Sequence, residues 1–256
     1  MLLGWINRAD AALLTTNSEL STLPASNVQQ AHVAQKWHTA AGVKSAYIVF
    51  DMGSSVACQL LGILGANLTA SATVRLRASV TDPAATGSLA LDTGSLAATA
   101  KTGYGQSYHD FTNTTARYWR LDLADATVAD NLQIGRVFLG PRWAPSSNQE
   151  YGWSVQVRDP SQVDRGYGGQ KYANTKPQMR LLQFSLSFMT EAEMYANAFA
   201  LARAAGVVGD VLAVHNTLGG AYIAEQSVWG ALLDVQPLVH ENYGIFRQKI
   251  TIEETL

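Results

Sequence analysis

The sequence predicts a mainly β protein of two domains, the second of which carries one helix. Apolar and polar residues alternate in several short segments, and only one segment of the 256 residues has a clear helical period. The segment 140–148 combines two prolines, a glycine and small polar residues, a composition typical of a linker. We therefore expect one domain over residues 1–143 and a different one over residues 144–256.

The first domain is predicted to consist of strands. In 73–80 every second residue is apolar up to Val80, so this face of the strand is expected to be buried. Asp51-Met52-Gly53 is a turn signal that should separate two apolar strands. The interval 81–107, rich in small residues, is expected to be a long loop of which a part forms a short extra strand. The predicted strands are 47–51, 57–64, 73–80, 117–123 and 132–139.

The second domain is predicted to combine strands with a helix at about 191–205. Thr190 and Glu193 have the spacing of a capping box, and Gly206 is placed to end the helix. One apolar stripe of this helix runs through Met194, Ala198 and Leu201, and another through Tyr195, Phe199 and Ala202. The predicted strands are 180–188, with Phe188 facing inward, then 210–215, 227–235 and 246–253.

Charge and cysteine content exclude several classes of protein. Lys and Arg number 18 and Asp and Glu number 20, so the formal net charge is −2. Such a chain lacks the basic face that binds nucleic acid or an anionic membrane surface. The single Cys58 excludes an intrachain disulfide and a cysteine-cluster zinc site. Because no long apolar stretch or signal-peptide pattern occurs, we expect neither membrane insertion nor export.

Motifs of catalysis are missing from the sequence. There is no nucleophile elbow, no phosphate-binding loop and no paired-histidine zinc motif. We therefore predict no enzymatic activity, no catalytic residues, no cofactor and no metal site. Two carboxylates brought together by folding could still cleave envelope polysaccharide, an alternative that no motif supports. Cys58 lies in an apolar segment and is predicted to be a buried hydrophobe rather than a reactive thiol.

Three residues are candidates for a carbohydrate site. Trp37 and His38 precede the first predicted strand, and Tyr104 lies in the long loop. Sugar sites combine an aromatic face with a few convergent hydrogen-bonding groups. Trp37 could offer such a face, or it could pack under the edge of a β-sandwich, which is the favoured alternative.

Residues 10–140 resemble the discoidin-like, galactose-binding-like β-sandwich, a jelly roll. The resemblance depends on the order of three features: Trp37, then a strand that ends in Asp51-Met52-Gly53, and later the aromatic-Arg-Leu strand 117–123. It implies a sandwich for the first domain and a possible glycan ligand on the host cell surface.

The whole chain resembles structural proteins of long-tailed phages. The matching segments are Leu23-Pro-Ala-Ser-Asn27, Ile134-Gly-Arg-Val-Phe-Leu-Gly140, Tyr151-Gly-Trp153 and the terminal strand 246–254. The second domain is similar to the tail-tube-like domain, in which one helix packs on a β-sandwich or barrel. The resemblance implies a ring of six copies, or less often three, that joins the tail tube to the hub proteins of the tail tip. The protein would then be part of the virion and assemble in the bacterial cytoplasm.

Two hypotheses of different class follow. The favoured one is a structural protein of a phage tail tip or baseplate, whose ring presents the sandwich outward. Arg247, Lys249 and Glu253 share one face of the last strand and would lie between subunits or line the lumen, or else form an ordinary solvated face. The alternative is a carbohydrate-binding module that contacts host glycans through Trp37, His38 and Tyr104.

Overall fold

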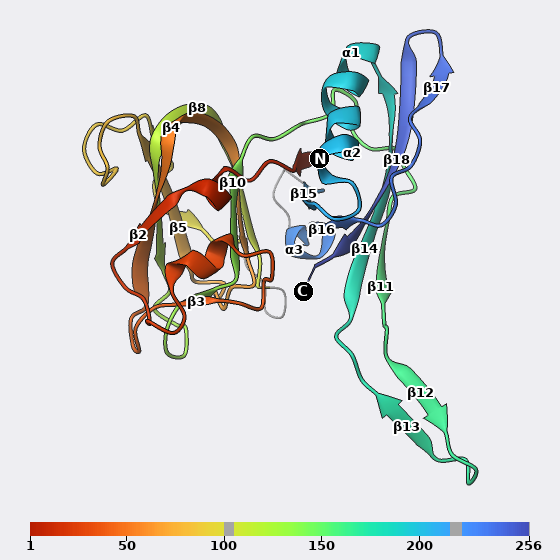
Figure 1. Ribbon diagram of the computed structural model, residues 1–256, viewed down its shortest axis with the longest axis horizontal. Helices are drawn as coiled ribbons and strands as arrows, with labels where there is room; N and C mark the ends of the chain where they lie inside the picture. The colour runs from red at the N-terminus through yellow and green to blue at the C-terminus, as the bar shows by residue number, and fades with distance from the viewer. Residues whose placement is uncertain (100–104, 216–221, 256) are drawn as a thin grey trace. The chain divides into compact units, whose positions relative to one another are not determined.

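The computed structural model describes residues 1–99, 105–215 and 222–255. Strands make up 48% of the chain and helices 11%, so the prediction of a mainly β fold is confirmed. The chain forms two compact units (Figure 1). The sandwich unit comprises residues 2–143 and 212–227, and the second unit comprises Met1, 144–211 and 228–256. The described residues of this segment, 212–215 and 222–227, therefore group with the sandwich, although their place in the sequence put them in the predicted second domain.

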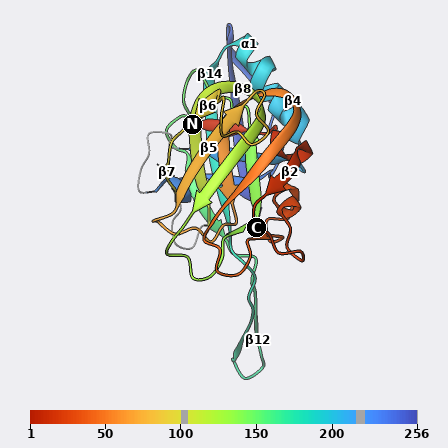
Figure 2. The same ribbon diagram turned by 90° about the vertical axis from the view of Figure 1, so that its left-hand side faces the viewer.

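The sandwich unit is built on two long, curled strands, β4 (Ser45–Leu64) and β8 (Ser107–Ala124), which lie side by side in Figure 2. Its strand order is β10-β4-β8-β5-β6, with β2 paired to β4 and β7 paired to β5. A separate short ladder joins β3 to β9, and β1 pairs with β15. The remaining bounds are β1 Leu2–Gly4, β2 Leu13–Thr16, β3 Trp37–His38, β5 Thr73–Ser79, β6 Leu91–Asp92, β7 Leu96–Ala97, β9 Gln133–Ile134, β10 Arg136–Gly140 and β15 Asp210–Val214, with short 3-10 helices at Arg8–Ala11 and Ala25–Gln29.

The predicted turn at Asp51–Gly53 is wrong, because β4 continues through it as one strand. The pairing with β8 shifts register between Asp51 and Val56, which marks an irregularity of the bulge type. Gly53 takes a positive φ of 73°, and its N–H donates to the Asp51 Oδ1 at 2.8 Å. Bulges bend a strand without ending it, so one strand of 20 residues can continue along the curled sheet.

The alternation in β5 is confirmed up to Ser79. Val74, Leu76 and Ala78 are buried, but Val80 is half exposed. The strand ends one residue earlier because Ser79 turns the chain: its Oγ donates to the Ser88 carbonyl and accepts from the Asp82 N–H. The expected extra strand in the interval 81–107 is present as the two-residue strands β6 and β7.

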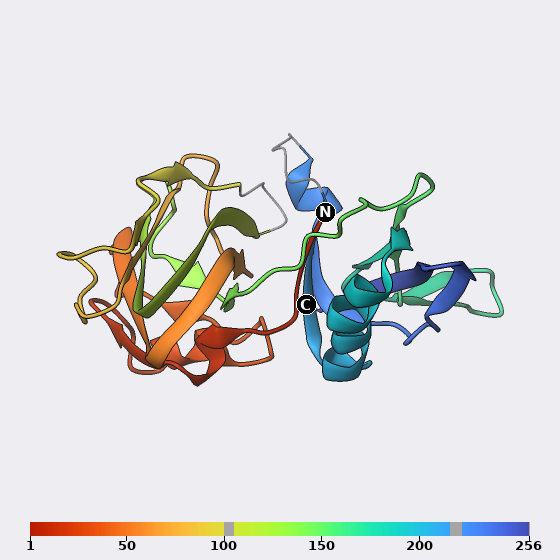
Figure 3. The ribbon, with the colours of Figure 1, turned by 90° about the horizontal axis from the view of Figure 1, so that it is seen from above.

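The second unit contains a sheet in the order β16-β18-β14-β11. Strand β17 pairs with the first residues of β18, from Ile245 to Arg247. A helical segment lies along this sheet (teal in Figure 3). A two-stranded hairpin, β12 with β13, continues beyond β11 and β14 (Figure 1). The bounds are β11 Ser154–Arg158, β12 Gln162–Arg165, β13 Lys171–Asn174, β14 Met179–Met189, β16 Val228–Leu232, β17 Val239–Asn242 and β18 Ile245–Glu254; the short helix α3, Ile223–Gln226, belongs to the sandwich unit.

The helix predicted at 191–205 is confirmed, with an irregular centre. It comprises α1 (Glu191–Glu193), a π-helical turn η3 (Met194–Phe199) and α2 (Ala200–Ala205). The Thr190 hydroxyl accepts from the Glu193 N–H at 3.2 Å, and Gly206 ends the helix with a positive φ of 52°.

Phe188 is mostly exposed, so the prediction that it faces inward is wrong. The pairing of β14 with β18 shifts register between Leu186 and Met189, and Phe188 has a positive φ of 61°. The shift changes which residues face the core, so Ser187 and Met189 are buried instead. None of the helices in these described ranges is long and apolar enough to cross a membrane.

Candidate functional site

Trp37 is fully buried in the sandwich, so the hypothesis of an exposed ring for sugar stacking is wrong for this residue. It lies in β3, and its indole Nε1 donates to the Ser18 carbonyl at 3.1 Å. Buried tryptophans usually satisfy their single donor in this way. The alternative, in which Trp37 packs inside the sandwich, describes its position.

His38 is partly exposed beside Trp37 and lines an open hollow of about 410 Å³. Burial, with a smaller contribution from the nearby Lys36 charge, lowers the pKa of His38. A neutral imidazole has one donor and one acceptor nitrogen, a useful pair for hydroxyl groups. The Asn27 amide is held by the Lys36 carbonyl at 2.9 Å and orders the loop around the hollow. Tyr104, the third candidate, lies outside the described residues.

Arg247, Lys249 and Glu253 share the solvent-facing side of β18, while Gln248, Ile250 and Ile252 are buried behind them. Arg247 Nη1 lies 3.4 Å from Glu241 Oε1, and Glu253 Oε2 lies 2.9 Å from Arg158 Nη1. Exposed pairs of this kind contribute little to stability. Whether this face lies between subunits or lines a lumen stays a prediction.

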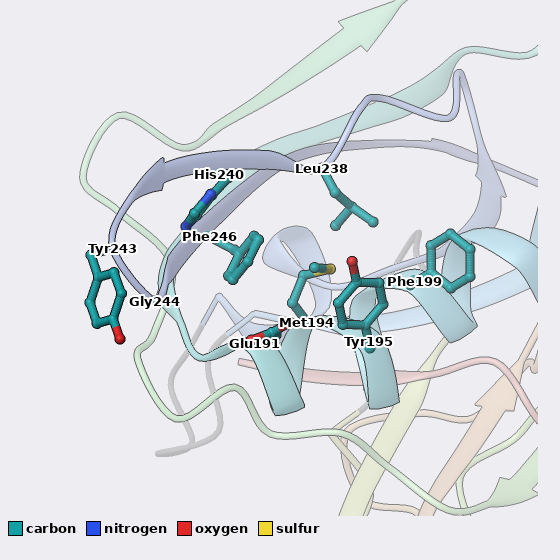
Figure 4. Close-up of a pocket in the computed structure, with 9 residues that line it drawn as sticks. All are labelled: Glu191, Met194, Tyr195, Phe199, Leu238, His240, Tyr243, Gly244 and Phe246. Atoms are coloured by element: carbon teal, nitrogen blue, oxygen red, sulfur yellow. The ribbon is translucent and has the colours of Figure 1, made fainter.

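The second unit contains an aromatic groove that was not predicted from the sequence. It is a hollow of about 700 Å³ between the start of the helix and the β17–β18 hairpin. Figure 4 shows aromatic side chains from both elements around it. We call it the aromatic groove; its lining residues are Glu191, Met194, Tyr195, Phe199, Leu238, His240, Tyr243, Gly244 and Phe246.

The helix supplies one wall of the aromatic groove. Its first apolar stripe is buried, with Met194 and Leu201 at 2% and 0% exposure, whereas Tyr195 and Phe199 are 55% and 44% exposed. The two aromatic rings lie 6.0 Å apart in an edge-to-face arrangement. The spacing of Tyr195 and Phe199 was the available signal, but the sequence does not distinguish a stripe that packs inside the unit from one that lines a surface groove.

The β17–β18 hairpin supplies the other wall. The His240 ring stacks on the Phe246 ring at 4.6 Å and 16°. The turn is tight because Gly244 has a positive φ of 68°, and Asn242 accepts from the Tyr243 N–H at 2.8 Å. Tyr243 stands at this turn and is 96% exposed. The groove is thus an open, aromatic surface suited to binding rather than to enclosing a reaction.

The β12–β13 hairpin, which we call the arm, was also missed. All four residues of β12 and all four of β13 are exposed. Its tip is the turn between Arg165 and Lys171, where Gly169 has a φ of 81° and the Gly166 N–H donates to the Gln170 carbonyl at 2.9 Å. A glycine-rich segment between two short β-prone runs is a hairpin signal. Tyr167, at this tip, is completely exposed.

The described residues contain no cluster arranged to bind a metal ion, and the one cysteine is unreactive. In residues 1–99, 105–215 and 222–255, no group of three or more His, Cys, Asp or Glu is placed to hold a metal ion. Burial raises the pKa of the Cys58 thiol to about 12, so it is not a thiolate at neutral pH. The prediction that Cys58 is a buried hydrophobe is confirmed.

Comparisons with known proteins concern about half of the chain. No protein-family model and no curated protein matches the sequence. Similar solved structures include chitosan-binding module 1 from a Paenibacillus chitosanase/glucanase, with 19% identity over 52% of this chain and 98% of that one and a TM-score of 0.42. A Clostridium perfringens carbohydrate-binding module in complex with GalNAc-β-1,3-galactose has 14% identity over 54% and 99%, with a TM-score of 0.43. A Streptococcus pneumoniae fucose-binding module has 14% identity over 54% and 96%, with a TM-score of 0.41. At these values the likeness assigns no binding residue to this chain.

Proposed function

We propose that this chain is a non-catalytic structural protein that assembles with copies of itself through the second unit. The observation that carries the proposal is the arm, whose eight strand residues are all exposed. A two-stranded hairpin is marginally stable by itself and usually needs a third strand or a packed face. In the described part of the chain, β12 and β13 pair only with each other. In a homo-oligomer, a second copy of the chain supplies the contact that such a hairpin lacks.

The edges of the second unit support the same proposal. Strand β17 is exposed at all four residues, and β11 is exposed at four of its five. Open strand edges are places where another chain can add to a sheet, and closed assemblies remove them. In the setting that the sequence resembles, the assembly is a ring of six copies, or of three, at a phage tail tip. It would join the tail tube to hub proteins and present the sandwich outward.

Removal of the arm tests this proposal. We expect a chain in which Asn-Gly replaces residues 162–174 to keep its fold, because the strands it loses are exposed throughout. Its self-association should weaken at least tenfold, as measured by light scattering over a concentration series. A matched control is Val208→Ser, which removes an apolar side chain that is 88% exposed outside the arm and should leave association unchanged. A natural chain that stays at 27.5 kDa at every concentration would contradict the proposal.

A second candidate function is glycan binding by the sandwich unit. The observation that favours it is the polar hollow beside the neutral His38 imidazole. The ligands named for the neighbours, chitosan, fucose and GalNAc-β-1,3-galactose, are suitable probes. We expect His38→Ala to weaken binding of a glycan at least tenfold by calorimetry. His32→Ala is the matched control, because His32 is exposed but does not line the hollow. Equal binding by both variants would place the glycan elsewhere.

A further inference from the structure

We infer that the tip of the arm of one copy binds in the aromatic groove of the next copy. This inference rests on the proposed self-assembly and names the two surfaces that meet. The groove exposes aromatic rings around a hollow of about 700 Å³, and the arm exposes Tyr167 at the end of a slender hairpin.

A copy cannot fill its own groove. The arm leaves the sheet next to Met179, which pairs with Arg158 at one end of β14. The groove lies at the other end, where Met189 pairs with Phe246. Strand β14 has 11 residues, so these ends are about 33 Å apart at roughly 3.3 Å per residue. The arm also continues away from α1 and the β17–β18 hairpin, as Figure 1 shows. A contact between arm and groove therefore joins two copies.

The charges of the two surfaces are complementary. Arg165 and Lys171 face each other across the arm as a strand pair, and both are exposed. The rim of the groove carries the exposed carboxylate of Glu191. Glu241 lies on β17 beside the groove and forms an ion pair with Arg247 of β18, in which Oε1 and Nη1 are 3.4 Å apart. With the neighbouring exposed carboxylate of Asp164 counted, this end of the arm still carries a net positive charge. It would meet a rim with a net negative charge, an arrangement that favours association and its orientation.

The narrow tip of the arm and the aromatic rings of the groove also match in shape and chemistry. Glycines at 166, 168 and 169 surround Tyr167, so the tip is narrow and its backbone can approach another surface closely. The groove offers Tyr195, Phe199 and Tyr243 as exposed aromatic partners. Aromatic pairs contribute about 0.5–1.5 kcal/mol beyond the area they bury, and an arginine over an aromatic ring adds a cation–π attraction.

Such a contact is head-to-tail, because each copy gives an arm and receives another. A head-to-tail interface closes into a ring when the rotation between copies allows it and otherwise makes a filament. It follows that two differently damaged copies can complement each other. A copy with a damaged tip still has an intact groove, and a copy with a damaged groove still has an intact arm.

Mixing two variants tests the inference. The tip variant is Arg165→Glu with Tyr167→Ser, and the groove variant is Glu191→Lys with Tyr243→Ser; all four side chains are exposed, so both should fold. We expect each alone to associate at least tenfold more weakly than the natural chain. An equimolar mixture should contain a species of twice the 27.5 kDa of one chain, and no larger one, by light scattering. If the tip variant dissociates while the groove variant assembles normally, the arm docks elsewhere and the inference is overturned, although the proposed function stands.

Crosslinking provides a second measurement that detects weak association. The only natural thiol, Cys58, is buried and should not react. We expect the full chain with Tyr167→Cys and Tyr243→Cys to form interchain products with a short bismaleimide at high protein concentration. The control pairs Tyr167→Cys with Val208→Cys, another exposed position of the second unit, and should give at most a trace. Equal yields from both pairs would overturn the inference. The absence of interchain products from either pair at any concentration would count against both the inference and self-assembly through the arm.

Discussion

Replacing Glu254 by glutamine is expected to destabilise the second unit by about 3–5 kcal/mol, the usual cost of breaking a buried ion pair. Both Glu254 and Arg180 side chains are less than 10% exposed. The Glu254 carboxylate accepts from the Arg180 backbone N–H at 3.0 Å, from its Nε at 2.9 Å and from its Nη2. The pair joins β14 to β18. Because Arg180 is buried, replacing Glu254 by glutamine leaves its guanidinium charge opposite a neutral amide.

Hydrogen exchange of the β14 and β18 amides would measure this loss in the second unit alone. The matched control is Glu241→Gln, which breaks the exposed pair with Arg247 and should cost less than about 1 kcal/mol. The double replacement Arg180→Met with Glu254→Leu should recover most of the stability, because it removes both buried charges. An effect of Glu254→Gln no larger than that of the control would show that the pair is dispensable.

Acidification is expected to destabilise the sandwich unit between pH 6.5 and pH 4 through His109. Burial lowers the pKa of His109 in β8 to about 4, from an ordinary value of 6.5. Between these values the unfolded chain binds more protons than the folded one, so stability rises with pH and is lost as pH falls. The difference corresponds to about 2 kcal/mol at pH 5, at roughly 1.4 kcal/mol per pKa unit.

Urea denaturation at a series of pH values would measure this slope. His109→Gln should reduce this slope, because the variant has no group that titrates in this window at this position. Part of the slope should remain, because burial also lowers the pKa of His215 in the same unit to about 4. His32→Gln, at an exposed position, should leave the slope unchanged. If the slope of His109→Gln equals that of the natural chain, the protons are taken up elsewhere.

Most strands of the core could be predicted because they bury one face. The alternation in 73–79, 117–123 and 180–186 reports burial directly, since successive side chains of a strand point to opposite sides. The helix could be predicted because its cap, period and terminal glycine agree. Val80 and Phe188 show where this logic ends: a turn after Ser79 and a register shift after Leu186 change the face that a residue occupies.

The candidate binding surfaces could not be predicted, because they depend on exposure rather than on pattern. Trp37 and Tyr195 look alike in the sequence, as aromatic residues whose exposure no local pattern reveals. Folding places the first inside the sandwich with its indole donor satisfied and the second on a groove wall. The arm carries too few apolar residues for a buried-strand pattern, so only its glycine-rich turn marked it.

The sequence by itself determined the mainly β class, the helix at 191–205 and the lack of any catalytic motif. These properties follow from local patterns, which short-range sterics and burial of one face enforce. Only the tertiary structure decided that β4 runs unbroken through Asp51–Gly53, that residues 212–215 and 222–227 group with the sandwich, and that an arm and an aromatic groove lie at opposite ends of β14. These features arise from pairings between distant segments, and such pairings leave no periodic trace in the chain.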